Sequence, residues 1–125
     1  MQDGKPLILY VDDDQDFLDS MRAILEANGY AMEEAISAEV ALRKFKEKRP
    51  DLIIIDLMME EVDSGISLVK ELRLLNNTAP IYMLSSAGDQ LNLATDYSEL
   101  GLEGIFQKPI QPKLLLKTLK EKLGV

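Results

Sequence analysis

Four apolar runs in the sequence end in side chains that could take part in chemistry. The runs and the residues that follow them are Leu7–Val11 with Asp12-Asp13-Asp14, Leu52–Ile55 with Asp56, Ile81–Leu84 with Ser85-Ser86, and Ile105–Gln107 with Lys108-Pro109. Carboxylates that lie close together in a partly dry site repel one another unless a cation or a proton joins them. Oxygen ligands without histidine or cysteine favour Mg²⁺ or a similar hard cation. If the four runs end at one place, their polar groups could therefore form an acidic, metal-binding site.

Each of these groups also has an ordinary structural interpretation. The three consecutive aspartates could cap a helix, and we expect Asp14 or Asp16 to do so. Asp56 could be a turn residue, while Ser85 and Lys108 could be surface side chains. Taken singly, none of them identifies a site. It is the delivery of a matching polar group by all four runs that favours a common site.

The elements that would position these groups begin with five short apolar runs. They are Leu7–Val11, Tyr30–Met32, Leu52–Ile55, Ile81–Leu84 and Ile105–Gln107. All are too short for helices, and Leu52–Ile55 is apolar without alternation, which is typical of a parallel strand buried on both faces. The sequence therefore predicts five strands.

Five further stretches have helical features. Four carry apolar residues at helical spacing: Phe17, Leu18, Met21, Ile24 and Leu25; Val40, Ala41 and Phe45; Ile66, Leu68, Val69, Leu72 and Leu75; Leu115, Leu116, Leu119 and Leu123. Expected start and stop signals are Asn28-Gly29, Ser37 with Pro50, Asn76-Asn77, Gly101 and Pro112. A helix at Gln90–Leu100 has the least regular pattern.

Strand and helix thus alternate five times along the chain. This order predicts a parallel sheet with helices on both faces, that is, a doubly wound α/β fold. Ligands of such sheets bind beyond the carboxyl ends of the strands. The fold would therefore bring the polar groups that follow the strands into one crevice.

The composition narrows the function further. The 125 residues fit one compact domain, and a 46% share of hydrophobic residues is enough for a core. With 14 basic and 22 acidic residues the net charge is −8, which disfavours direct binding to nucleic acid. No apolar run approaches the roughly 18 residues of a membrane span, and Leu7–Val11 is too short for a signal peptide. The absence of histidine and cysteine excludes a Ser-His-Asp triad, histidine metal ligands and disulfides, and is compatible with the cytoplasm.

Four segments together resemble a known family. They are ILYVDDD, DLIIIDLMM, PIYMLSSA and GIFQKPI, and they place Leu7–Leu123 close to the receiver domain of bacterial two-component response regulators. The resemblance implies one receiver domain over residues 1–125 with its core at 7–123. It also implies a flavodoxin-like sheet in the order 2-1-3-4-5 with five helices, and a cytoplasmic location.

The resemblance also assigns roles to the residues at the strand ends. It implies the phosphoacceptor Asp56, direct Mg²⁺ ligands Asp13 and Asp56, a water-mediated ligand Asp12, the backbone carbonyl of Met58 as a further ligand, and phosphoryl contacts from Ser85 and Lys108. A carboxylate that attacks a phosphoryl group brings two anions together, so a metal ion and a lysine must neutralise charge. The family further implies a cis peptide bond at Lys108–Pro109.

The partners implied are a histidine kinase or a histidine phosphotransfer protein as donor. An unknown downstream protein would bind the face formed by the fourth helix, the fifth strand and the fifth helix. Neither nucleic acid nor membrane would be contacted directly. Such a domain is a signalling module and not an enzyme, since it promotes only its own phosphorylation and dephosphorylation.

The sequence departs from the family pattern at three places. Glu60 stands where proline is frequent, and Asp63-Ser64-Gly65 has one residue more than the usual Asp-Gly. Ile105 occupies the position, three residues before the lysine, where an aromatic ring usually turns inward on activation. Because a branched aliphatic side chain has few rotamers, we expect activation to move Ser85–Gly88 and the start of the fourth helix instead.

Three other functions compete with this interpretation. A flavodoxin-like cofactor module would need a hydroxyl- or glycine-rich phosphate cradle after the first strand, where this chain has acids. A phosphohydrolase with an aspartate nucleophile would need a second acid two residues later, where this chain has Met58. A degenerate receiver that only binds partners would have lost some of the acids, the serine or the lysine, all of which are present.

Overall fold

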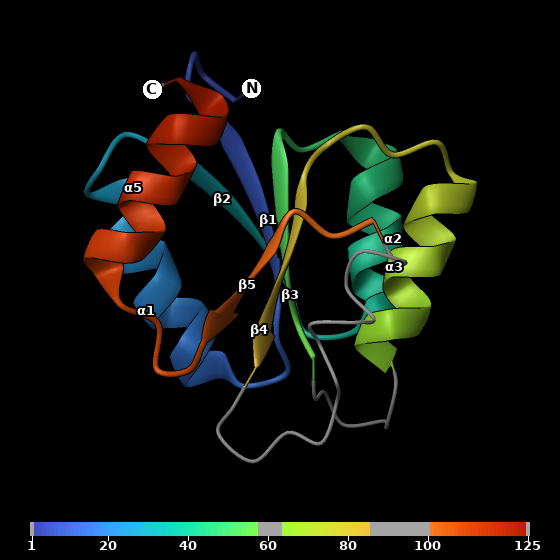
Figure 1. Cartoon of the computed structure of the whole chain (residues 1–125). Coiled ribbons are helices and arrows are strands. Elements are labelled where there is room, and N and C mark those ends of the chain that lie inside the picture. Colours follow the sequence, from blue (N-terminus) through green and yellow to red (C-terminus); the bar gives the residue numbers. More distant parts are fainter. Residues whose placement is uncertain (1, 58–63, 86–100, 125) are drawn as a thin grey trace.

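Figure 1 shows the computed structural model of the chain, which describes residues 2–57, 64–85 and 101–124. Its elements in chain order are β1 (Leu7–Val11), α1 (Gln15–Glu26), β2 (Ala31–Ala35), α2 (Ala38–Glu47), β3 (Leu52–Asp56), α3 (Ser64–Leu74), β4 (Ile81–Ser85), β5 (Gly104–Gln107) and α5 (Pro112–Leu123). The helix predicted at Gln90–Leu100, most of the Ser85–Gly88 segment, and the departures at Glu60 and Asp63 fall outside the described residues.

The five strands form one parallel sheet in the order β2-β1-β3-β4-β5, which confirms the predicted topology. Its register aligns the carboxyl ends of the strands. Val11 pairs with Ile55, and Ser85 pairs with Gln107. The residues that end or follow β1, β3, β4 and β5 therefore meet at one edge of the sheet.

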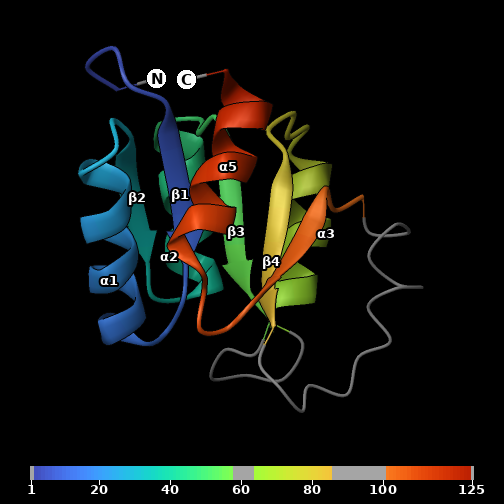
Figure 2. The ribbon, with the colours of Figure 1, turned by 60° about the vertical axis from the view of Figure 1, so that its left-hand side comes forward.

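Helices α1 and α5 cover one face of the sheet, and α2 and α3 cover the other (Figures 1 and 2). Alternate strand residues point to the two sides, so that Leu9 and Ile53 pack with α2 and α3 while Ile8 and Ile54 pack with α1 and α5. Both sides of β1, β3 and β4 are buried. This explains why the apolar runs of these strands do not alternate with polar residues.

Strand β2 corrects the predicted boundaries. The apolar run at Tyr30–Met32 predicts a strand there, whereas β2 spans Ala31–Ala35 and includes two glutamates. β2 is an edge strand, and three of its five side chains, both glutamates included, are only partly buried. Arg22 contacts Glu34 at 2.9 Å and Lys44 contacts Glu33 at 3.4 Å, which compensates both charges.

The helix ends agree with the predicted signals. The Asp14 carboxylate caps α1 by accepting a 2.9 Å hydrogen bond from the Asp16 N–H, and the Ser37 hydroxyl caps α2 by accepting one of 3.2 Å from the Val40 N–H. Pro112 opens α5. In the part of the chain that the structure describes, no helix has both the length and the apolar character needed to cross a membrane.

Candidate functional site

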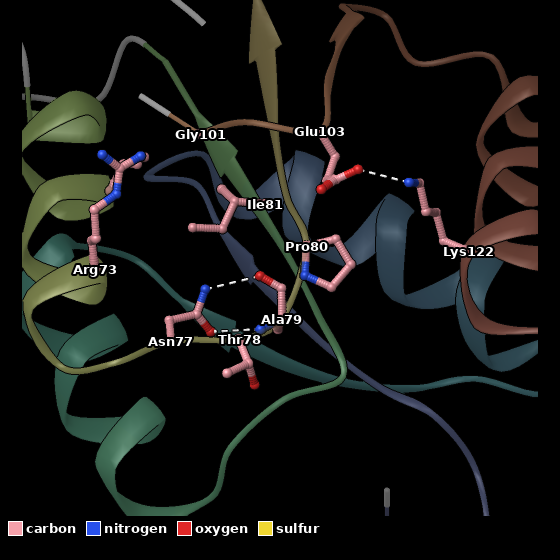
Figure 3. Close-up of a pocket in the computed structure, with 10 residues that line it drawn as sticks. Arg73, Asn77, Thr78, Ala79, Pro80, Ile81, Gly101, Glu103 and Lys122 are labelled. Atoms are coloured by element: carbon pink, nitrogen blue, oxygen red, sulfur yellow. Dashed lines mark hydrogen bonds and ion pairs between the residues drawn. The ribbon is translucent and has the colours of Figure 1, made fainter. Parts of the chain in front are cut away.

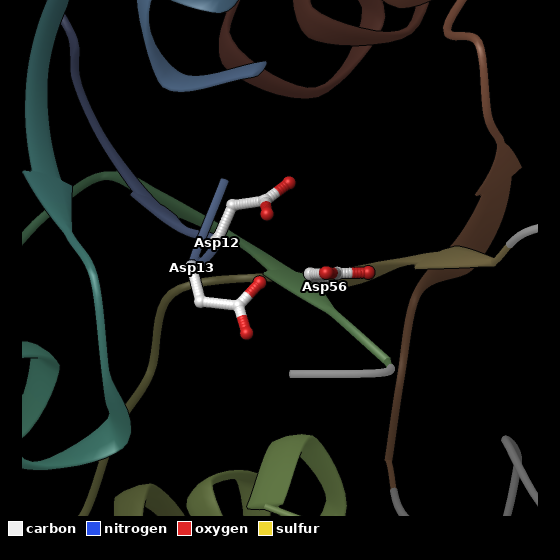
Figure 4. Close-up of side chains that lie close together, drawn as sticks. All are labelled: Asp12, Asp13 and Asp56. Carbon is white, nitrogen blue, oxygen red and sulfur yellow. The ribbon is translucent and has the colours of Figure 1, made fainter. Parts of the chain in front are cut away.

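Three aspartates gather where β1 and β3 end (Figure 4). One carboxylate oxygen from each of Asp12, Asp13 and Asp56 lies within 4.8 Å of the others. Asp12 is fully buried and Asp56 is 3% exposed, whereas Asp13 faces solvent. The predicted convergence of these acids is therefore found, and one side of the cluster is open to a ligand from solution.

Lys108 reaches this cluster from the loop after β5. Its Nζ lies 3.0 Å from Asp12 Oδ2 and 3.2 Å from Asp56 Oδ2. The Lys108 N–H donates a 2.8 Å hydrogen bond to the Ser85 carbonyl, and the Lys108–Pro109 bond is cis, as predicted. Burial lowers the pKa of Lys108, but the hydrogen bond to Asp12 and the charge of Asp56 outweigh it and leave the pKa raised. The ammonium group is therefore charged at neutral pH.

Two aromatic residues that sequence reasoning missed complete the surroundings of the lysine and Asp12. The Tyr10 hydroxyl donates a 2.5 Å hydrogen bond to Asp12 Oδ2, and Lys108 Nζ lies 4.0 Å from the centre of the Phe17 ring. Burial, followed by the hydrogen bond to Asp12, raises the pKa of Tyr10, so it stays a neutral donor. The signal for Tyr10 was its position: residues two apart in a strand share a face, and Tyr10 precedes Asp12 by two.

Of the other predicted site residues, the structure describes Ser85 but not Met58. Ser85 is the last residue of β4 and is 5% exposed, so it lies on the same edge as the acids. Its hydroxyl makes no hydrogen bond within residues 2–57, 64–85 and 101–124. Met58 and Ser86 lie outside the described residues. The aromatic neighbour of Ile105 does not replace the missing ring, because Phe106 is buried on the α1 and α5 side, where it stacks on Tyr82 at 5.2 Å.

The acidic cluster fits a hard divalent cation. Its possible ligand atoms among the described residues are carboxylate oxygens, and there three carboxylates are grouped with one lysine, so these groups together carry excess negative charge. Mg²⁺ prefers such oxygen ligands and needs only one or two carboxylates beside water. The arrangement can therefore hold a cation next to Asp56.

A cavity of about 370 Å³ lies at the other end of the sheet from the acidic cluster, between α3, the start of β4 and α5 (Figure 3). It is lined by Val69, Arg73, Asn77, Thr78, Ala79, Pro80, Ile81, Gly101, Glu103 and Lys122. Gly101 has φ of +78°, a backbone conformation that favours glycine, and a Cβ atom there would require the flexible end of the Arg73 side chain to move. The cavity holds one carboxylate, and that carboxylate pairs with Lys122 at 2.6 Å. The residues that line this cavity include no cluster of carboxylates, so the cavity does not match the acidic site that the sequence predicts at the carboxyl ends of the strands.

The sequence matches the response regulator receiver domain over residues 8–120. It is 34% identical to the alkaline phosphatase synthesis transcriptional regulatory protein PhoP of Bacillus subtilis over 106 residues, which are 85% of this chain and 43% of PhoP. It is 33% identical to the chemotaxis protein CheY of Bacillus subtilis over 118 residues, which are 94% of this chain and 97% of CheY. The chain thus spans less than half of PhoP and nearly all of this CheY.

Solved structures show the same fold. Chemotaxis protein CheY4 of Vibrio cholerae superimposes with a TM-score of 0.85 at 30% identity, covering 95% of this chain and 99% of CheY4. A CheY-like receiver domain protein of Methanospirillum hungatei gives a TM-score of 0.86 at 30% identity, covering 97% of this chain and 95% of the other. The chain belongs to the response regulator receiver domain family. Its class is that of the signalling receivers of two-component systems, whose members act with histidine kinases and downstream effectors.

Proposed function

We propose that Asp56 is the phosphoacceptor of this receiver domain and that Mg²⁺ supports the transfer. The observation that carries the proposal is the setting of Asp56. Its carboxylate is almost fully buried, lies 3.2 Å from the ammonium group of Lys108, and shares a cluster with Asp12 and Asp13. A nucleophile of this kind needs nearby positive charge when it meets a phosphoryl group, and the site supplies it from one side.

The reaction is a transfer of one phosphoryl group. An oxygen of Asp56 forms a bond to phosphorus while the bond between phosphorus and the donor breaks, and the leaving group keeps that bonding pair. With a phosphohistidine donor the broken bond is P–N, and the product is an aspartyl phosphate. Lys108 would pair with the new phosphoryl oxygens, and Ser85 would donate its hydroxyl to one of them.

Asp13 and Asp56 would hold the ion directly, with Asp12 acting through water and Met58 through its backbone carbonyl. Bound Mg²⁺ would neutralise part of the charge of the incoming phosphoryl group. The fully buried Asp12 already has donors on both carboxylate oxygens, from Tyr10 and Lys108 on one and the Asp14 N–H on the other. Asp13 faces solvent, which supports direct ligation by Asp13 and an outer position for Asp12.

The proposed partners follow from the same site and from the surface beside it. The donor would be a histidine kinase or a histidine phosphotransfer protein. The downstream partner would bind near β5 and α5, where a hollow of about 510 Å³ includes Ile105, Pro109 and Leu114. Leu114 is 49% exposed, so this surface offers apolar area to another protein. The net charge of −8 speaks against direct contact with nucleic acid.

The test uses acetyl phosphate as a small donor. With Mg²⁺, the parent chain should gain the mass of one phosphoryl group, and Asp56→Asn should gain none. Asp19→Asn, which changes an exposed aspartate of α1, is the matched control and should react like the parent. The bound phosphate should be lost in alkali, as an acyl phosphate is. Phosphate that survives alkali, or that also appears on Asp56→Asn, would contradict the proposal.

A further inference from the structure

Tyr10 lies on β1 beneath the acidic cluster, and its ring is completely buried. The ring packs among the apolar side chains between the sheet and helices α1 and α5. Its hydroxyl is turned toward the site, where it donates a 2.5 Å hydrogen bond to Asp12 Oδ2. A buried hydroxyl bonded to a buried carboxylate fixes the position of both groups, because neither can turn to water instead.

Among the described residues the carboxylate of Asp12 has three donors. Oδ2 accepts from Tyr10 and contacts Lys108 Nζ at 3.0 Å, and Oδ1 accepts from the Asp14 N–H at 3.0 Å. Lys108 is divided between two anions, since the same Nζ lies 3.2 Å from Asp56 Oδ2. Of the two donors on Oδ2, only Tyr10 belongs to the rigid centre of the sheet. Lys108 belongs to a loop and has a second partner to which it can turn.

We propose that Tyr10 is a positioning residue of the site. Its neutral hydroxyl holds Asp12 in place, so that Lys108 can turn to a phosphoryl group on Asp56 without leaving Asp12 Oδ2 with no donor. This inference rests on the proposed function and adds to it a residue that touches neither the phosphoryl group nor the metal ion.

The chemical type of the side chain at position 10 determines both the charge of the site and the partners of Asp12 Oδ2. A cation at position 10 would also hold Asp12, but it would cancel the negative charge that attracts Mg²⁺. An apolar side chain would leave Lys108 as the only partner of Oδ2 in the described part of the chain, and would bind it more firmly to Asp12. A phenol supplies a hydrogen bond without a charge, and its ring fills the core. Outer partners of this kind change metal affinity by about 10- to 100-fold when they are removed, because the ligand group loses its orientation.

The test compares two substitutions that each remove one buried hydroxyl. Tyr10→Phe should weaken Mg²⁺ binding by about tenfold, measured as Kd by calorimetry on the folded protein. Tyr82→Phe is the matched control. Tyr82 is 5% exposed, belongs to the same apolar cluster and stacks on Phe106. It has no hydrogen bond to the three aspartates of the acidic cluster among the described residues. Its Kd for Mg²⁺ should stay within about twofold of the parent value, whatever happens to its folding stability.

A second measurement needs no stable variant. The Tyr10 hydroxyl proton of the parent protein should give a slowly exchanging NMR signal, because the hydrogen bond is shielded from water. That signal should persist when Mg²⁺ and beryllofluoride, a phosphoryl mimic, are added. An unchanged Kd in Tyr10→Phe, or loss of the proton signal on adding the mimic, would overturn the inference. Failure of the parent to bind Mg²⁺ or accept phosphate would instead overturn the proposed function.

Discussion

Two lysine–carboxylate pairs at opposite ends of the sheet differ in what surrounds them. At the amino end Lys122 meets Glu103 at 2.6 Å, with their side chains 42% and 41% exposed. At the carboxyl end Lys108 meets Asp12 and Asp56 at 3.0 and 3.2 Å, with the lysine 11% exposed and Asp12 fully buried. The shorter contact is the less important one, because water screens it and each charge is solvated without its partner.

The difference lies in charge balance and burial. The exposed pair is complete in itself, with one cation and one anion. Within residues 2–57, 64–85 and 101–124, the buried group has one cation for three carboxylates, and two of these carboxylates are shielded from solvent. Such a site has excess negative charge, so it can bind a cation. Its lysine can also change partners when a new anion, such as a phosphoryl group, enters the site. The exposed pair has no comparable excess of charge.

The largest expected effect comes from removing each lysine in turn. Lys108→Met leaves two buried carboxylates without their cation, so in metal-free buffer we expect a loss of about 3 kcal/mol in the free energy of unfolding. Lys122→Met should cause no measurable change. Urea unfolding of both variants beside the parent measures the two losses. Similar losses in the two variants would break the distinction between the two ends.

Addition of Mg²⁺ should also distinguish the two ends of the sheet, because the ion should stabilise the protein through the acidic cluster alone. At ten times its Kd the ion should stabilise the parent by roughly 1.4 kcal/mol, which corresponds to a rise of a few degrees in Tm. Asp13→Asn should abolish this rise and should increase the metal-free Tm, because it removes one of the crowded charges. Glu103→Gln, which changes the acid at the other end, should keep the full response. A normal Mg²⁺ response in Asp13→Asn would show that the ion binds elsewhere.

The contact between Lys108 and Phe17 is a smaller contribution. The ammonium group lies 4.0 Å from the ring centre, where the negative face of the ring attracts it. Phe17→Leu should therefore cost roughly 1 kcal/mol more in the parent than in the Lys108→Met background. A double-mutant cycle from urea unfolding measures this coupling. An equal cost in both backgrounds would mean that the ring contributes packing alone.

The carboxyl end of the sheet could be predicted from the sequence, whereas the bounds of its edge strand β2 could not. The carboxyl end was predicted because each buried strand is a continuous apolar run, and the first polar residue after it marks the place where the strand stops. Strand β2 was misplaced because an edge strand tolerates Glu33 and Glu34, which break the apolar signal. The charges of Glu34 and Glu33 are balanced by Arg22 and Lys44, which lie on the helices directly before and after β2, and the apolar pattern of the strand itself does not show these pairs.

Tyr10 and Phe17 show a second limit of sequence patterns. Tyr10 reads as one more apolar residue of a buried strand, and only its hydroxyl and its two-residue offset from Asp12 give it a polar function. Phe17 belongs to the apolar stripe of α1, and nothing near it in the sequence indicates Lys108. Their roles depend on the direction of individual side chains, which periodicity does not specify.

The smallest expected effect concerns the ion pair of Arg22 and Glu34. Their side chains are 34% and 28% exposed, which is more than for Lys108 and its partners and less than for Lys122 and Glu103. The hydrogen bond from Arg22 lowers the pKa of Glu34 from its usual 4.5. A lowered pKa in the folded state adds stability above the usual pKa, and this stability disappears as the pH falls through the lowered value. Arg22→Gln should therefore cost less than about 1 kcal/mol at neutral pH, and in strong acid only the part that comes from the 3.2 Å hydrogen bond of Arg22 to the Met32 carbonyl should remain. Arg43→Gln, on exposed α2 surface without an ion pair among the described residues, removes the same charge and should cost little at either pH. Thermal unfolding of both variants at the two pH values measures the difference. A cost for Arg22→Gln that is the same in acid would assign its contribution to the Met32 hydrogen bond and to packing rather than to the charges of Glu34 and Glu26.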